Sequence, residues 1–159
     1  MRTRIISAFP GTGKSVFHKN NPTTTLDSDS SNFSWSYMTG EKERHPAFPF
    51  NYINHIKKNI GRYEFIFVSS HEVVRKALID NAIFFYWITP IADRKEEFIQ
   101  RYKDRGNEEV FVKLLETKWD DWMDEFYLDP GIGMRKIPMT LPYLGDELDH
   151  IIKCENGEM

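Results

Sequence analysis

The sequence predicts an α/β protein with a five-stranded, parallel, doubly wound sheet and helices on both faces. Two continuous apolar runs, at residues 65–68 and 83–89, have the composition of strands that are buried on both faces of a sheet. Amphipathic helical patterns follow these runs, so strands and helices alternate along the chain as they do around parallel sheets. The 159 residues, of which 40% are hydrophobic, suit one domain with a substantial core.

The most informative stretch includes the first expected strand. Residues 5–17 read IISAFPGTGKSVF, which is an apolar strand, a glycine-rich turn and the start of a helix. Gly11 and Gly13 leave room for consecutive backbone N–H groups to surround a phosphate, because no side chain intrudes there. Lys14 would then reach the terminal phosphates of a nucleotide. Ser15 would place its hydroxyl on Mg²⁺, and the helix N-terminus would add a favourable partial charge.

Two aspartates follow the next expected strand. The helix after the glycine-rich turn must end near Pro22, since the residue before a proline disfavours helix. Residues 23–26 then form a short, β-branched strand that leads to Asp27 and Asp29. In an open α/β sheet, ligands bind outside the carboxyl ends of the strands, so we expect both carboxylates near the glycine-rich turn. The polar and aromatic residues 30–48 form a candidate acceptor-binding segment.

Helices are expected on both sides of the strand at residues 65–68. Apolar residues recur at helical spacing in residues 50–60, before that strand. After it, Ser69 and Glu72 have the spacing of a capping box, which predicts a second helix start. His71, which lies between them, is either a helix-start residue or an acceptor contact.

Residues 94–105 form an expected helix that begins after Asp93 as its N-cap. Arg94, Arg101 and Arg105 fall on one face of this helix, at spacings of seven and four residues. They could neutralise a transferring phosphoryl group. The alternative is an ordinary solvated face on which the arginines pair with acidic neighbours, namely Glu96, Glu97 or Asp104.

The remaining chain completes the domain. A long amphipathic helix is expected over residues 110–126. Residues 134–139 form an expected fifth strand, at the edge of the sheet because Pro138 cannot donate a ladder hydrogen bond. A short last helix closes a single domain, residues 1–153, and residues 154–159 are expected to be a polar tail.

The stretch AFPGTGKS at residues 8–15, followed one short helix later by Asp27, Ser28 and Asp29, resembles the nucleoside-monophosphate-kinase and shikimate-kinase branch of the P-loop kinases. The resemblance implies the P-loop NTPase fold. It also implies that Asp27 acts on the magnesium shell and that Asp29 contacts the hydroxyl that becomes phosphorylated. Residues 90–107, with the arginine helix, match the short helical LID of that branch.

Two departures and a second resemblance bear on the acceptor. Ala8 stands where the full phosphate-loop pattern has glycine, and residues 69–71 lack the aspartate-containing signature of nucleoside-monophosphate kinases. The segments VSSH at 68–71 and RKEEFIQRYKDRGN at 94–107 resemble small phage-encoded nucleotide kinases. The two resemblances agree on a kinase and leave its acceptor open.

The expected function is transfer of the γ-phosphoryl group of ATP, with Mg²⁺, to a nucleotide or nucleoside acceptor. A polynucleotide or modified-base DNA kinase is the alternative, and a non-catalytic nucleotide-binding module is the second alternative. The expected catalytic residues are Lys14, Asp29, Arg101 and Arg105. The expected donor contacts are Gly11, Thr12, Gly13, Lys14, Ser15, Val16 and Arg94, and the expected magnesium ligands are Ser15 and, through water, Asp27.

Composition limits the expected partners and compartment. The formal net charge of −3 gives no general attraction to nucleic acid, so such binding would need a local basic face. The one cysteine, Cys154, suits a reducing compartment. The sequence has no signal-peptide pattern and no apolar run of about 20 residues. We therefore expect a soluble, cytoplasmic protein that does not enter a membrane.

Overall fold

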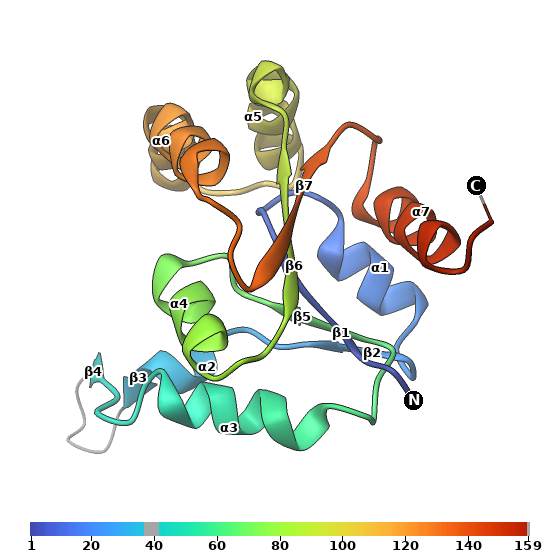
Figure 1. Ribbon diagram of the computed structural model, residues 1–159. Helices are drawn as coiled ribbons and strands as arrows, with labels where there is room; N and C mark the ends of the chain where they lie inside the picture. The colour runs from blue at the N-terminus through green and yellow to red at the C-terminus, as the bar shows by residue number, and fades with distance from the viewer. Residues whose placement is uncertain (37–41, 159) are drawn as a thin grey trace.

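The computed structural model describes residues 1–36 and 42–158 and has an α/β fold (Figure 1). Its main sheet contains β1 (Arg4–Ala8), β2 (Thr25–Asp27), β5 (Phe65–Val68), β6 (Phe85–Pro90) and β7 (Met134–Met139). The spatial order is β2-β5-β1-β6-β7, and each neighbouring pair is parallel. This confirms the predicted five-stranded parallel sheet, with residues 134–139 at its edge. β1 lies at the centre.

Helices flank this sheet on both faces. They are α1 (Lys14–Asn20), α2 (Ser31–Ser34), α3 (Phe50–Asn59), α4 (Glu72–Asp80), a 3₁₀ turn η1 (Ala92–Arg94), α5 (Lys95–Asp104), α6 (Glu109–Leu128) and α7 (Leu144–Glu155). In Figure 1, α3 and α4 lie on one side of the sheet, α1 and α7 on the other, and α5 and α6 beyond the end of β6. A small antiparallel sheet of β3 (Trp35–Ser36) and β4 (Glu43–Arg44) lies near α2. Within residues 1–36 and 42–158, no helix is long and apolar enough to cross a membrane.

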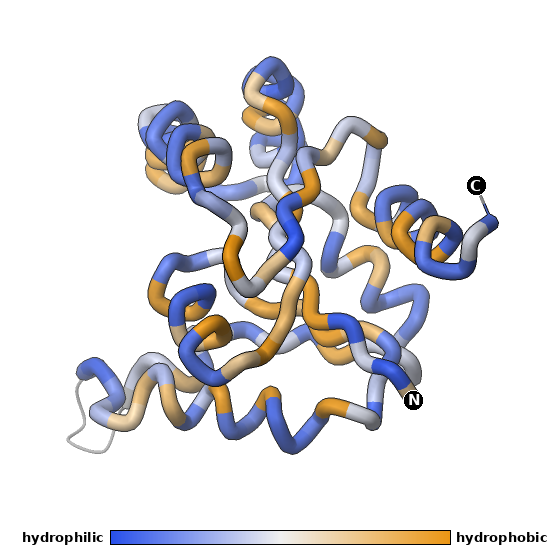
Figure 2. The backbone as a smooth tube through the Cα atoms, viewed as in Figure 1, coloured by the Kyte–Doolittle hydropathy of each residue, from blue (hydrophilic) through white to orange (hydrophobic). Residues whose placement is uncertain are grey.

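The strands supply side chains alternately to two hydrophobic clusters, one on each face of the sheet. In β5, Phe65 and Phe67 join the cluster that contains residues of α5, α6 and α7, whereas Ile66 and Val68 join the cluster that contains residues of α3 and α4. Successive side chains of a strand point to opposite faces, which explains why the whole apolar run of β5 is buried. Figure 2 shows hydrophobic residues gathered in the central strands and mixed with hydrophilic ones along the outer helices.

Two predicted helix starts are wrong. α4 begins at Glu72 without a side-chain cap, because the hydroxyl of Ser69 donates to Ser30 Oγ at 2.6 Å instead of closing a capping box. The arginine helix begins with the 3₁₀ turn Ala92–Arg94, so Asp93 lies inside the first turn and not at the N-cap of α5. In the first case, a tertiary contact takes the hydroxyl that local spacing had assigned to the cap.

The last helix, α7, is longer than the sequence pattern indicated and ends at Glu155. The expected boundary between the domain and its polar tail, after residue 153, therefore falls inside α7. The Glu155 carboxylate accepts hydrogen bonds from Arg2 (3.2 Å), from Arg4 Nε (2.8 Å) and from the Tyr86 hydroxyl. These contacts fix the end of α7 to β1 and β6.

Candidate functional site

The loop between β1 and α1 has two glycines in the left-handed backbone region. Gly11 has φ +84° and Gly13 has φ +104°, conformations that residues with a side chain rarely adopt. An ideal Cβ atom on Gly11 would also lie 2.5 Å from Cε1 of Tyr102, whose side chain is buried. The backbone angle and the packing therefore both require glycine at position 11.

This loop presents a run of unpaired backbone donors. At the start of α1, Phe17 donates its N–H group to Gly13 O at 3.0 Å. Within the described residues, the N–H groups of residues 11–16 have no backbone acceptor. Lys14 is the first residue of α1 and is half-buried, whereas Ser15 is exposed. A run of N–H groups beside a lysine fits a phosphate group.

Donors from two distant helices hold the carbonyl groups of this loop. The carbonyls of residues 10, 11 and 12 accept hydrogen bonds from the Tyr102 hydroxyl (2.7 Å), Arg101 Nη1 (2.9 Å) and the Leu144 N–H group (2.8 Å), respectively. Burial raises the pKa of Tyr102, so its hydroxyl stays a neutral donor. Because Tyr102 and Arg101 belong to α5 and Leu144 begins α7, both helices fix the shape of the loop.

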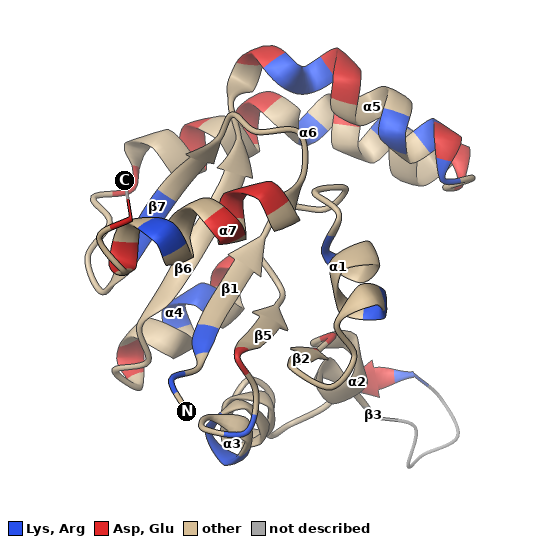
Figure 3. Cartoon of the chain, turned by 90° about the vertical axis from the view of Figure 1, so that its right-hand side faces the viewer, with Lys and Arg blue, Asp and Glu red and all other residues tan. Residues whose placement is uncertain are grey.

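The structure brings Arg94 and Arg101 together around one carboxylate. Arg94 Nε (2.9 Å) and Arg101 Nη2 (2.6 Å) both donate to Glu97, and both side chains also donate to the carbonyl of Pro142. The hydrogen bond from Arg94, together with the charges of both arginines, lowers the pKa of Glu97. Arg105 lies apart, exposed at the C-cap of α5. Figure 3 shows charges of both signs along α5, as this pairing requires.

Arg101 is also held by aromatic rings. Its guanidinium carbon lies 4.5 Å from the centre of the Phe98 ring and 4.6 Å from that of Tyr143. A Cβ atom on Gly13 would lie 3.5 Å from the Tyr143 ring. The Arg101 side chain is therefore packed beside the glycine loop, between α5 and the start of α7.

The two aspartates lie at the carboxyl end of β2. Asp27 is the last residue of the strand, and the Ser28 N–H group continues the ladder by donating to Phe67 O at 2.9 Å. Asp29 is exposed, and its Oδ1 accepts a hydrogen bond from the Ser31 N–H group at 2.9 Å. Only β5 separates β2 from β1, so the aspartates and the glycine loop follow strands that are about 10 Å apart, at the same end of the sheet.

Tyr52 of α3 positions the residue between these aspartates, and sequence reasoning missed it. Its hydroxyl donates to the Ser28 carbonyl at 2.7 Å, and its side chain is fully buried. Burial raises the pKa of Tyr52 to about 12, so the hydroxyl remains a donor at neutral pH. The apolar pattern of the 50–60 helix rests on Phe50, Ile53, Ile56 and Ile60, so it assigned no role to Tyr52.

Two adjoining hollows lie beside Asp29 and the start of the loop that follows β1. One, of about 420 Å³, is lined by residues that include Asp29, Ser34, Trp35, Arg44 and Phe48. The other, of about 270 Å³, is lined by residues that include Phe9, Arg75, Trp87, Trp122 and Glu125. His71 and Glu72 line both hollows, so we treat the two as one cleft and call it the His71 cleft.

The candidate acceptor-binding segment, residues 30–48, contributes to this cleft. Trp35 is the aromatic centre of that contribution, because Lys42 Nζ and the guanidinium carbon of Arg44 lie 4.2 and 4.5 Å from its ring centre. Arg44 itself lines the cleft and is exposed. Residues 37–41 of the segment lie outside the described residues.

Arg75 of α4 is a buried cation in the wall of the His71 cleft. It is 5% exposed, and its Nε donates to Ser70 O at 2.9 Å. Its Nη2 forms an ion pair with Glu125 of α6, and its guanidinium carbon lies 3.7 Å from the centre of the Trp87 ring. Arginines in amphipathic helices are usually solvated, so no sequence pattern indicated this role.

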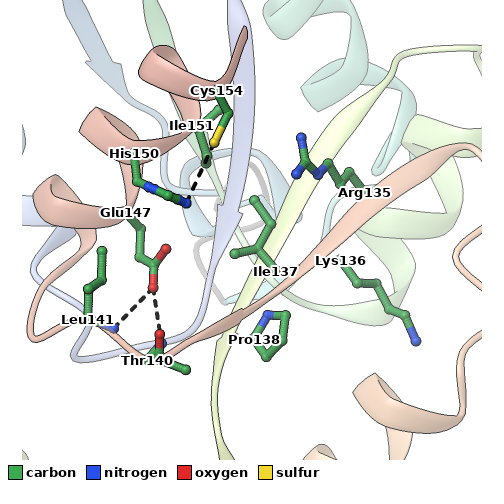
Figure 4. A pocket seen from close by; sticks show the side chains of 10 residues that line it. All are labelled: Arg135, Lys136, Ile137, Pro138, Thr140, Leu141, Glu147, His150, Ile151 and Cys154. Atoms are coloured by element: carbon green, nitrogen blue, oxygen red, sulfur yellow. Dashed lines mark hydrogen bonds between the residues drawn. The ribbon is translucent and has the colours of Figure 1, made fainter. Parts of the chain in front are cut away.

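A separate hollow of about 410 Å³ lies between β7 and α7 (Figure 4). Glu147 in its wall is buried and accepts hydrogen bonds from the N–H groups of Thr140 (3.0 Å) and Leu141 (3.1 Å). Its lining residues are distinct from those of the His71 cleft. Glu147 therefore serves to hold the connection from β7 to α7.

The described residues, 1–36 and 42–158, contain no group of three His, Cys, Asp or Glu side chains that could hold a metal ion. Magnesium at the expected place would need oxygen ligands from a nucleotide as well as from the protein. The chain offers the Ser15 hydroxyl on α1 and the Asp27 carboxylate on β2, two elements joined by the 2.7 Å hydrogen bond between His18 and Thr25. Oxygen ligands of these kinds fit Mg²⁺.

Comparisons with known proteins do not assign this chain to a family. No family model matches the sequence, and no curated protein matches it. The class that the fold and the site define is an α/β protein with a five-stranded, all-parallel sheet and a glycine-rich loop after its central strand.

Proposed function

We propose that this protein is a P-loop kinase that transfers the γ-phosphoryl group of ATP, with Mg²⁺, to a nucleotide or nucleoside. The observation that supports this most strongly is the glycine-rich loop. Residues 11–16 present unpaired backbone N–H groups after the central strand, and Lys14 lies within that run. Such a loop suits the phosphates of a nucleoside triphosphate.

The proposed roles of the chain follow from phosphoryl-transfer chemistry, which depends on positioning and charge balance. Bound ATP would supply the group that is transferred. Lys14 would contact its terminal phosphates, and Ser15 and Asp27 would hold Mg²⁺, Asp27 through water. Asp29 would accept the proton of a hydroxyl acceptor, or would only bind the acceptor if that group is a phosphate.

The arginines of α5 are the proposed source of positive charge. Arg101 contacts the Gly11 carbonyl, so its guanidinium is beside the loop that would hold the phosphates. Arg94 is the proposed donor contact, and Arg105 is the more exposed proposed catalytic group. Glu97 forms an ion pair with Arg94 and another with Arg101. Either arginine would therefore have to weaken its ion pair with Glu97 before it could contact a phosphate.

Two buried hydroxyls give further support. Thr12 Oγ1 and Ser28 Oγ are among the buried polar atoms without a hydrogen-bond partner in the described residues. Such a group costs about 1–3 kcal/mol, so native chains keep few of them. Thr12 lies in the glycine-rich loop and Ser28 lies between the two aspartates, where the proposal puts ATP and Mg²⁺.

A hydroxyl on nucleic acid is the second candidate acceptor. Trp35 with Lys42 and Arg44 against its ring resembles the combination of stacking surface and positive charge that binds single strands. A polynucleotide or modified-base DNA kinase would use this group at the mouth of the His71 cleft.

Incubation with γ-labelled ATP and Mg²⁺, against nucleosides, nucleotides, shikimate-like alcohols and oligonucleotides, tests the proposal. We expect label on a nucleoside or nucleotide, and Asp29→Asn should lose transfer while still binding ATP. Label on oligonucleotides alone would favour the second candidate. ATP binding without transfer to any acceptor would make the protein a nucleotide-binding module.

A further inference from the structure

We propose that the His71 cleft takes an uncharged acceptor, a nucleoside with a free hydroxyl, and discriminates against nucleoside monophosphates. This proposal rests on the proposed kinase function and narrows its acceptor. It follows from the charges in the cleft wall, from the ion pair that Arg75 forms and from the aromatic rings in the smaller hollow, the one of about 270 Å³.

Carboxylates outnumber guanidinium groups in the wall of the cleft. Among the described lining residues, Asp29, Glu72 and Glu125 are acidic, whereas Arg44 and Arg75 are the arginines. A nucleoside monophosphate adds a group with nearly two negative charges at neutral pH. Lys42 and Arg44 lie against Trp35 at the mouth of the cleft, but Asp29 and Glu72 form no ion pair within the described residues. A phosphate placed beside these two carboxylates would therefore be repelled.

Arg75 offers no free positive charge to a phosphate, because its guanidinium group is already paired inside the wall. Glu125 forms an ion pair with it, the Ser70 carbonyl accepts from its Nε, and the Trp87 ring covers its guanidinium group. To bind a phosphate, Arg75 would have to give up its ion pair with the half-buried Glu125 carboxylate. Arg44 is the other cation of the described lining, and it is exposed on β4 beside Trp35.

The smaller hollow of the cleft suits a neutral ring. Phe9, Trp87 and Trp122 line it, and the rings of Phe9 and Trp122 lie 5.9 Å apart, edge to face. Its volume of about 270 Å³ is near the lower end for small-molecule sites, which suits one nucleoside. Polar side chains, among them Ser70 and Thr89, line it as well. Aromatic rings that stack on a flat base, together with polar groups that can hydrogen-bond its edge, suit a nucleobase.

A hydroxyl acceptor also gives Asp29 a chemical role that a phosphate acceptor does not require. The acceptor oxygen forms a bond to the γ-phosphorus, and the bond from that phosphorus to the oxygen that bridges the β- and γ-phosphates breaks. The hydroxyl proton passes to the Asp29 carboxylate, and ADP leaves with the bridging oxygen. The products are ADP and a nucleoside monophosphate, and no redox step is needed.

Equilibrium binding tests this proposal without depending on turnover. The full chain is saturated with Mg²⁺ and a non-hydrolysable ATP analogue, so that the glycine-rich loop is occupied. Thymidine, adenosine, their 5′-monophosphates and a short single-stranded oligonucleotide are then titrated and followed by calorimetry and tryptophan fluorescence. We expect each nucleoside to bind at least about tenfold more tightly than its monophosphate, the size of effect that one like-charge contact near a protein surface can produce.

Charge-neutralising variants connect the preference to the cleft. Glu125→Gln should raise the affinity for monophosphates several-fold. If loss of this partner of Arg75 prevents folding, Glu72→Gln gives the same test, because Glu72 is exposed. Glu116→Gln is the matched control, because Glu116 is exposed on α6 and lines neither hollow. It should leave the ratio of affinities unchanged.

Three results would overturn the proposal: monophosphates that bind as tightly as nucleosides, binding of oligonucleotides alone, or binding of neither class. Failure of the proposed kinase function is distinguished by a different measurement. In that case the ATP analogue would bind Lys14→Ala as tightly as the wild type. An unchanged affinity ratio in both Glu72→Gln and Glu125→Gln would also exclude the charge mechanism.

Discussion

Replacement of Tyr52 by phenylalanine removes one hydroxyl and keeps the ring that fills the core. The lost interaction is the 2.7 Å hydrogen bond to the Ser28 carbonyl, at a side chain with no exposed surface. Such a bond contributes about 0.5–1.5 kcal/mol, and a buried carbonyl without its donor raises the loss toward about 1–3 kcal/mol. We expect Tyr52→Phe to lower the unfolding free energy by about 1–2 kcal/mol, which corresponds to about 2–8 °C in Tm for a chain of this size.

Denaturant unfolding measures this loss, with the exposed Tyr127→Phe as a control that should change stability by less than about 0.5 kcal/mol. The same variant distinguishes positioning from packing. The Tyr52 hydroxyl holds Ser28, between the two aspartates, and makes no hydrogen bond to the glycine-rich loop within the described residues. We therefore expect kcat for the proposed transfer to fall, by up to about tenfold, while the Kd for ATP stays the same. A variant with wild-type stability and wild-type kcat would refute the reasoning.

Two further predictions concern the glycine-rich loop and the helix that holds it. Gly11→Ala places a methyl group at φ +84° and against the buried Tyr102 ring, so we expect the free energy of unfolding to fall by about 2–4 kcal/mol and ATP to bind more weakly. Thermal unfolding measures the first effect and equilibrium titration the second. Wild-type stability and affinity would contradict the packing of Tyr102 against this loop. The hydrogen bond from Arg94, followed by the charges of Arg94 and Arg101, lowers the pKa of Glu97 below its usual value of 4.5. A carboxyl group whose pKa is lowered in the folded state stabilises the fold at pH values above its usual pKa. We therefore expect the difference in Tm between the wild type and Glu97→Gln to be present above pH 4.5 and to shrink as the pH falls below it. A difference that does not depend on pH would exclude this ion pair as its cause.

Much of the fold could be predicted because the strands of this chain have local signatures. The apolar run at residues 65–68 is β5 to the residue, since a strand buried on both faces has no polar position. Residues 134–139 are β7 and lie at the edge of the sheet. An edge strand tolerates Pro138, which has no N–H group to donate. These features depend on composition within a few residues, which a sequence displays directly.

The candidate site was only partly predictable, because several of its contacts join residues that are far apart in the sequence. Tyr52 contacts a residue 24 positions away, and the ion pair of Arg75 with Glu125 spans 50 positions. Local patterns assigned no role to Tyr52. They described Ser69 as a helix cap, whereas its hydroxyl contacts a loop after another strand.

The pairing of the arginines on α5 shows the same limit at shorter range. Helical spacing put Arg94 and Arg101 on one face, and the structure confirms that they lie together. Spacing alone left open whether that face served a phosphate or an acidic neighbour. Glu97 occupies both guanidinium groups in this structure, so a phosphate would have to compete with it.

The most direct test of the central claim is the affinity of the chain for ATP with Mg²⁺, measured by calorimetry for the wild type, Lys14→Ala and Lys19→Ala. Lys14 begins α1 directly after the glycine-rich loop, whereas Lys19 is an exposed lysine near the end of the same helix. The account predicts that Lys14→Ala raises the Kd at least about tenfold, as loss of a charged phosphate contact should, and that Lys19→Ala leaves it unchanged. Equal affinity in all three proteins, or no binding by the wild type, would contradict it.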